Sequence, residues 1–216
     1  IDTHVHAPRF QPDEELFHTL YLMHGVTTVR NLGGGDRVFD VARAIDKGER
    51  IGPRTLSCGV PLDGPQGSDI ALEIESAQDA ADAVQALHES GAKCIKVYPM
   101  IASDVFLALK KEAKKLGLPV VGRMNNRLGV EGASMDEVHH LHGVLDVVSP
   151  GYRMNDVSEW LKAWKKKFSK ERIDLTVRMS QMHGSAHVPS LVGVGYLAAR
   201  KMKRVPRPKM RLLPDW

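Results

Sequence analysis

The sequence lacks several features that mark particular classes of protein. It has only two cysteines in 216 residues, too few for the disulfide framework of a small secreted domain. No apolar run is long enough to span a bilayer, so we expect no membrane partner, and the first residues do not follow the pattern of a signal peptide. No G-x-G-x-x-G motif follows the first predicted strand, which argues against a dinucleotide-binding fold. Cys58 and Cys94 lie in strand-like segments, where we expect small buried apolar side chains.

The sequence also has no large excess of positive charge. The formal net charge of +4 is too small to indicate a nucleic-acid partner, and we expect none. Basic residues do gather near the C-terminus, but no aromatic side chains are interleaved with them, so we interpret them as a solvated helix end and loop. These residues are Arg200, Lys201, Lys203, Arg204, Arg207, Lys209 and Arg211. The chain does not begin with Met, and we interpret it as a processed form, a trimmed chain or a fragment.

Apolar strand-like segments alternate with helix-period segments along the chain. This alternation is typical of βα units and a parallel sheet, and seven such units favour a barrel over an open sheet. We predict one α/β domain over residues 1–216, with a (β/α)8 TIM-barrel-like fold that is incomplete. The predicted strands are 1–6, 26–30, 54–58, 94–98, 119–123, 137–141 and 187–192. The predicted helices are 13–24, 36–47, 76–90, 103–116, 157–168, 170–182 and 194–202, and an irregular loop rich in Pro and Gly covers 61–68.

The first predicted strand carries two histidines in the sequence Ile1-Asp2-Thr3-His4-Val5-His6. Because successive side chains of a strand point to opposite faces, Asp2, His4 and His6 share one face. Two imidazoles placed in this way could hold a divalent metal at the mouth of a barrel. The alternative is that these are two solvated histidines without a function near a chain end. The motif alone does not distinguish this alternative from a metal site.

Further polar residues lie at the C-terminal ends of the predicted strands, where barrels of this class carry their chemistry. Lys96 is the most informative, because it interrupts the apolar segment 94–98 and a buried ammonium must be paired, neutralised or modified. Carbamylation would turn Lys96 into a carboxylate able to bridge two metal ions. A salt bridge to an acid such as Asp2 is the alternative, which composition alone favours. The other residues at strand ends are Arg30, Asn31, Tyr98, Arg123, Asn125 and Asn126.

The sixth predicted strand contains three histidines in Val138-His139-His140-Leu141-His142. Alternation places His140 and His142 on one face and His139 with Leu141 on the other. Since Leu141 marks the side that faces the helices, we predict His140 as a metal ligand, with His142 as the second choice.

Taken in order, these segments resemble the amidohydrolase superfamily, in its imidazolonepropionase- and prolidase-like branch. The likeness rests on the segments 1–6, 25–34, 52–54, 91–98, 117–122, 137–143 and 187–192. The resemblance implies a barrel with one or two divalent ions, usually zinc. His4 and His6 would hold one ion, carbamylated Lys96 would bridge the pair, and His140 would hold the second ion. It also implies a hydroxide, activated by metal, that attacks a carbonyl or amidine-type carbon.

The chain departs from this family pattern in two ways. Arg123 stands where the family has a histidine on strand five, and a guanidinium has no lone pair for a metal. The eighth strand, its aspartate and the flanking β domain are also absent from this sequence. We expect a metal-dependent hydrolase of C–N bonds in an amide, dipeptide or cyclic amide, with Lys96 catalytic. A metal-deficient, non-catalytic barrel that binds a small anion or a protein is the alternative.

We also expect particular partners and substrate contacts from residues at the strand ends and from the strand edges. Tyr98, Arg30 and Arg123 are the predicted substrate-binding residues, and the substrate is a small molecule. Unpaired strand edges make a homo-oligomer an expectation as well.

Overall fold

The computed structural model describes residues 1–6, 11–65, 67–124, 128, 134–141 and 170–191. The predicted helices at 157–168 and 194–202, the basic residues after 199 and His142 lie outside these ranges. The first elements are β1 (Asp2–Val5), α1 (Gln11–Met23), β2 (Thr28–Asn31), α2 (Arg37–Asp46), β3 (Arg54–Ser57), β4 (Leu62–Asp63) and β5 (Leu72–Glu73). They are followed by α3 (Ala77–Ser90), β6 (Ile95–Val97), α4 (Ser103–Lys115), β7 (Val120–Gly122), β8 (Glu137–His139), α8 (Lys170–His183) and β9 (Ala186–Val188).

The strands form two parallel sheets, as the alternation of strands and helices predicts. One sheet has the order β1-β2-β3 and the other has the order β5-β4-β6-β7-β8-β9. Every pairing among the described strands is parallel. Apart from β5 at the edge, the strands follow one another in space as they do in the sequence. The prediction of an α/β fold with parallel strands is therefore confirmed, although no pairing among the described strands closes a barrel.

The predicted loop at 61–68 contains a strand that the sequence pattern did not indicate. Leu62 and Asp63 form β4, which pairs with β6, whereas β3 pairs with β2. The chain thus passes from one sheet to the other within residues 58–61. The prediction of an irregular loop is wrong for these two residues, because a two-residue strand is too short to show any alternation.

The two cysteines lie where the chain passes between the sheets. Both are buried, as expected, but they are joined in a disulfide between the end of β3 and the start of β6. The backbone N–H of Lys93 also donates to the carbonyl of Ser57, at 2.8 Å. The prediction that Cys58 and Cys94 are simple apolar side chains is wrong in this respect, because a pairing across 36 residues leaves no local pattern in the sequence.

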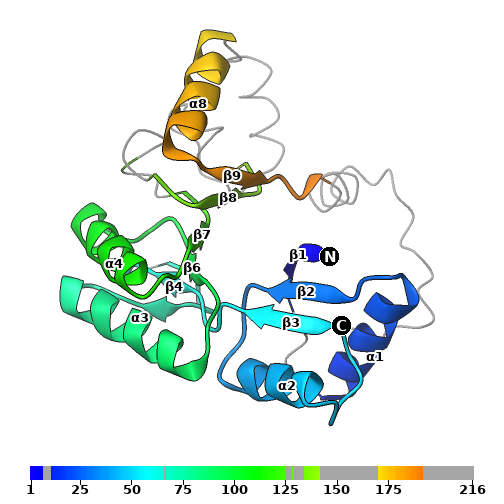
Figure 1. Cartoon of the computed structure of the whole chain (residues 1–216). Helices are drawn as coiled ribbons and strands as arrows, with labels where there is room; N and C mark the ends of the chain where they lie inside the picture. The colour runs from blue at the N-terminus through cyan, green and yellow to red at the C-terminus, as the bar shows by residue number, and fades with distance from the viewer. Residues whose placement is uncertain (7–10, 66, 125–127, 129–133, 142–169, 192–216) are drawn as a thin grey trace.

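Helices α2, α3 and α4 lie on the outside of the sheets, whereas α8 extends away from β8 and β9 (Figure 1). In α3, the Ser76 side chain accepts from the backbone of Asp79 and the Asp79 side chain accepts from the backbone of Ser76, which caps its N-terminus. Gly91, with φ of 102°, ends this helix. Helix α3 packs against α4, and α2 packs against β3. None of the helices described here is long and apolar enough to cross a membrane.

The main hydrophobic core lies between the sheet of β4, β6 and β7 and helices α3 and α4. Its fully buried members include Leu62, Val84, Ile95, Phe106 and Leu109. A smaller buried cluster joins Leu32, Cys58, Cys94 and Val121 across the two sheets. These cores fix the strands whose C-terminal ends carry the candidate site.

Candidate functional site

Four imidazoles gather at the C-terminal ends of β1 and β8. His4 lies on β1 and His6 directly follows it, while His139 ends β8 and His140 directly follows it. His4 Nδ1 lies 2.5 Å from His139 Nδ1, and His4 Nε2 lies 3.3 Å from His6 Nε2. The rings of His4 and His140 have centroids 4.4 Å apart. Strands that are 135 residues apart in the sequence thus place their histidines together.

The orientation predicted for His139 is wrong. Its side chain is fully buried against His4 and does not face the helices. Strict alternation stops at this point, because β8 ends at His139 and the next two residues, His140 and Leu141, have φ of 60° and 55°. Both His139 and His140 therefore reach the cluster. No local signal separates this turn from a continued strand, since neither residue is glycine.

Lys96 lies at the centre of β6, and all three residues of this strand are buried. It is 1% exposed, and its pKa is lowered to about 7, mainly by burial and then by the charges of Arg123 and Arg30, with Glu137 opposing the shift. Among the described residues no ion pair joins Lys96 to a carboxylate, and Asp2 instead accepts from the backbone of His4. The salt bridge to Asp2 that the composition favoured is therefore not formed.

The four imidazoles are held neutral. Burial lowers the pKa of His4 and His139 to about 2 and that of His140 to about 4, and it also lowers the pKa of His6. The Lys96 charge is the second-largest cause of the lowered pKa in every case. Neutral imidazoles carry the lone pair that a metal requires.

Two of these nitrogens fit a single zinc ion. In a tetrahedral site with Zn–N bonds of about 2.0–2.1 Å, ligand nitrogens lie roughly 3.3 Å apart, as His4 Nε2 and His6 Nε2 do. A hydrogen on His4 Nδ1 satisfies its contact with His139 and leaves Nε2 as the donor. No group of three or more His, Cys, Asp or Glu in the described ranges is arranged to hold a metal. The remaining ligands would have to come from elsewhere, such as a modified Lys96.

Arg30, predicted as a substrate contact, has its donors engaged within the protein. Its Nη1 and Nη2 donate to the two carboxylate oxygens of Glu137 at 2.6 and 2.5 Å, and its Nε donates to the carbonyl of Thr3 at 2.9 Å. These contacts link β2 to β1 and to β8. They favour a role for Arg30 in positioning the histidine-bearing strands, and contact with a substrate stays a prediction.

Arg123 and Tyr98 lie together beside the histidine cluster. The guanidinium carbon of Arg123 lies 4.8 Å from the centre of the Tyr98 ring, and the Lys96 ammonium lies 5.8 Å from it. The Arg123 charge lowers the pKa of His6, His140 and Lys96. A cation thus occupies this side of the cluster, which disfavours a second metal ion there.

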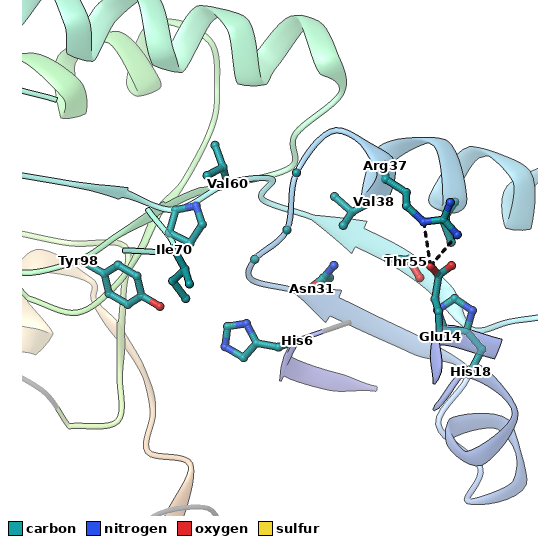
Figure 2. A pocket seen from close by; sticks show the side chains of 15 residues that line it. His6, Glu14, His18, Asn31, Arg37, Val38, Thr55, Val60, Ile70 and Tyr98 are labelled. Atoms are coloured by element: carbon teal, nitrogen blue, oxygen red, sulfur yellow. Dashed lines mark hydrogen bonds and ion pairs between the residues drawn. The ribbon is translucent and has the colours of Figure 1, made fainter. Parts of the chain in front are cut away.

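A cavity of about 550 Å³ extends away from this cluster (Figure 2). His6 and Tyr98 line one end, and Glu14, His18 and Arg37 line the other. Glu14 and His18 are almost fully buried on α1, and Arg37 pairs with Glu14 at 3.3 Å. Neither Glu14 nor His18 is among the residues that the sequence indicates for the site. Their positions i and i+4 on one helix are the only pattern that could have indicated them.

Comparisons with known proteins find similarity only at the level of structure. No family model matches the chain, and no curated protein matches it. The chain is similar to a bottromycin amidohydrolase, with 26% sequence identity and a TM-score of 0.66 over 77% of this chain and 36% of that one. It is similar to another amidohydrolase at 20% identity and a TM-score of 0.68, over 96% of this chain and 56% of that one.

Two further solved structures have the same fold. An A. niger ochratoxinase matches at 15% identity with a TM-score of 0.66, over 97% of this chain and 56% of that one. A Xaa-Pro dipeptidase matches at 19% identity with a TM-score of 0.62, over 94% and 55%. The chain therefore spans between about a third and just over half of the length of these proteins. The expected likeness to amidohydrolases is confirmed at the level of fold.

Proposed function

We propose that this chain carries the metal-binding part of a metal-dependent hydrolase that acts on C–N bonds in an amide, dipeptide or cyclic amide. The observation that carries the proposal is the group of four neutral imidazoles beside the buried Lys96. The likeness in fold to amidohydrolases and a dipeptidase, proteins whose names describe cleavage of such bonds, supports it.

His4 and His6 are the proposed ligands of one zinc ion. The 3.3 Å separation of their Nε2 atoms supports this assignment, and so do their lowered pKa values. We assign His139 as a positioning residue, because its contact with His4 Nδ1 fixes the tautomer and orientation of that ring. His140 remains a candidate ligand of an ion on the same side. An ion held here would polarise a carbonyl and lower the pKa of water.

Lys96 is proposed to act as a carbamate. The reaction joins the neutral amine to carbon dioxide through a new N–C bond and releases one proton, so that a neutral group becomes a negative one. Starting from the ammonium, two protons are released and a positive charge becomes a negative one. A pKa of about 7 supports it, because about half of the amine is neutral and nucleophilic at pH 7. The change also suits the surroundings, since Arg30 and Arg123 both disfavour a positive charge on Lys96 and would attract a negative one.

Carbamylation can be tested separately from catalysis. Zinc-loaded protein equilibrated with ¹³C-labelled bicarbonate is expected to show a carbamate carbon resonance. The resonance should persist in Lys93→Met, which changes the neighbouring lysine, and should vanish in Lys96→Met. A resonance that survives in Lys96→Met, or none in the wild-type protein, would contradict this assignment.

Hydrolysis is tested with the zinc-loaded chain on a panel of N-acetyl amino acids, dipeptides and cyclic amides. Cleavage is expected for the wild-type chain and for His88→Ala, which alters an exposed histidine on α3, and it should be lost in His4→Ala. Equal rates in His4→Ala would refute the proposal.

The alternative function, a non-catalytic barrel, is favoured by one observation, the presence of the Arg123 cation beside the imidazoles. Arg123→His separates the two functions. If zinc uptake or hydrolysis arises only in this variant, the native chain is a binding module.

A further inference from the structure

The histidine cluster has more cationic than anionic groups around it. Arg30, Lys96 and Arg123 all act on the imidazoles or on one another. Glu137 is the nearby acid that opposes them, and both of its oxygens already accept from Arg30. Glu137 therefore does not pair with Arg123.

The second nearby acid, Asp63, is also engaged. It is 3% exposed, its Oδ1 accepts from the backbone of Gly64 and Met100, and its Oδ2 accepts from the backbone of Ser68. Its carboxylate shapes the turn after β4 and the start of the segment after Tyr98. It acts on the pKa of Tyr98 but forms no ion pair with Arg123.

Arg123 is held in place by its backbone and by an aromatic ring. Its N–H donates to the carbonyl of Val97 at 3.0 Å, and the preceding Gly122 has φ of 135°, a conformation that favours glycine. The guanidinium stacks over Tyr98. Its Nε is buried and has no hydrogen-bond partner among the residues that the structure describes. A buried guanidinium donor without an acceptor is costly. Since Arg123 as a whole is partly exposed, an anionic ligand against its side chain would offset part of this cost by its charge.

The adjoining cavity suits the apolar part of such a ligand. Tyr98 lines it together with Val60, Pro61 and Ile70 (Figure 2), and the Arg123 guanidinium lies against the Tyr98 ring. The Tyr98 side chain extends toward Ile70 in this view. A ligand with an acidic head and an apolar body could therefore place the head at Arg123 and the body against these three residues.

We propose that Arg123, stacked on Tyr98, binds the carboxylate of a small organic acid whose apolar part lies in the cavity lined by Val60, Pro61 and Ile70. A carboxylate matches the planar donors of a guanidinium. That the acid is the substrate or product of hydrolysis rests on the proposed function, whereas its binding does not. Arg123 then acts where the family pattern has a metal ligand, and it selects a ligand in place of a second ion.

The test uses the metal-free chain and two probes that differ in charge, 3-phenylpropionate and its neutral amide, 3-phenylpropanamide. Calorimetric titration is expected to give a Kd for the acid at least tenfold lower than for the amide. Arg123→Gln should weaken binding of the acid at least tenfold and leave binding of the amide unchanged. Arg123→Lys should lose less, because it keeps the charge.

Arg37→Gln is the matched control, since Arg37 lines the cavity at the end away from Tyr98 and is paired with Glu14. Its Kd for the acid should stay within twofold of the wild-type value. Loss of binding in Arg37→Gln with retention in Arg123→Gln would overturn the proposal, and so would equal affinity of the wild-type chain for acid and amide. The last comparison needs no variant and holds even if Arg123→Gln fails to fold.

Failure of the proposed function would look different. A chain that binds 3-phenylpropionate through Arg123 but takes up no zinc supports this inference and contradicts the hydrolase. A chain that takes up zinc and hydrolyses amides, and whose Arg123→Gln variant binds the acid as tightly as the wild type, supports the hydrolase and contradicts this inference.

Discussion

The ion pair between Arg30 and Glu137 should be one of the strongest single contacts between distant parts of this chain. It is bidentate, at 2.6 and 2.5 Å, and its side chains are only 14% and 21% exposed. Removing one partner of a buried pair costs about 3–5 kcal/mol, because the other charge stays buried without compensation. The partial exposure here lowers the expected cost to about 2–4 kcal/mol for each of Arg30→Met and Glu137→Gln.

The contribution of the pair itself is measured by a double-mutant cycle. Urea unfolding of the wild-type protein, the two single variants and the double variant should give a coupling free energy of about 1.5–3 kcal/mol. The control cycle uses Arg43 and Asp40, a pair on α2 with side chains 57% and 73% exposed, for which we expect less than about 0.5 kcal/mol. Equal coupling in both cycles would refute the idea that Arg30 joins the histidine-bearing strands.

Three further predictions concern the framework of the site. Gly122→Ala should lower the free energy of unfolding in urea by more than about 2 kcal/mol, because φ of Gly122 is 135° and a Cβ there would clash with the backbone oxygen of Val97. Gly117→Ala, which has open space around the added Cβ, should lower it by about 1 kcal/mol. Equal losses would contradict the structure. Replacing Cys58 and Cys94 together by Ala should cost about 4 kcal/mol for a sequence separation of 36, and thiol titration of the unfolded wild-type chain without reductant should find no free thiol. The pKa of His139 is lowered from 6.5 to about 2 in the folded chain, so unfolding takes up a proton at any pH between these values. The free energy of unfolding of the metal-free chain should therefore fall by about 1.4 kcal/mol per pH unit for this group below about pH 6, and not above pH 7. A melting temperature that is constant from about pH 7 to 4 would exclude this coupling.

Local sequence patterns predicted most of the described fold. The helix at 76–90 was indicated by Ala80, Val84 and Leu87 on one face, and these side chains are buried in α3. Most of the strands were indicated by short β-branched or apolar segments between helix ends. These features depend on residues within a few positions of one another, so a sequence alone carries them.

Features that join distant residues could not be predicted in this way. The disulfide, the strand β4 and the pairing of Arg30 with Glu137 all depend on which strands become neighbours. The position of His139 depends on where β8 ends, which alternation alone does not determine.

The sequence identified the residues of the candidate site better than it predicted their contacts. The structure brings together His4, His6, Lys96 and His140, the residues that the sequence indicated as metal ligands. Their role as ligands stays a prediction. The contact between His139 and His4 was missed, because a histidine placed by alternation on the wrong face gave no reason to expect it.

The most direct test of the account is the zinc content of the chain. The protein is loaded with zinc, dialysed against metal-free buffer and measured by elemental analysis, with His88→Ala as the control for an exposed histidine. We expect one zinc per chain in the wild-type protein and in His88→Ala, a loss of thermal stability on chelation, and little zinc in His4→Ala or His6→Ala. No retained zinc in the wild-type chain, or the same content in His4→Ala, would contradict the claim that the first strand holds a metal ion.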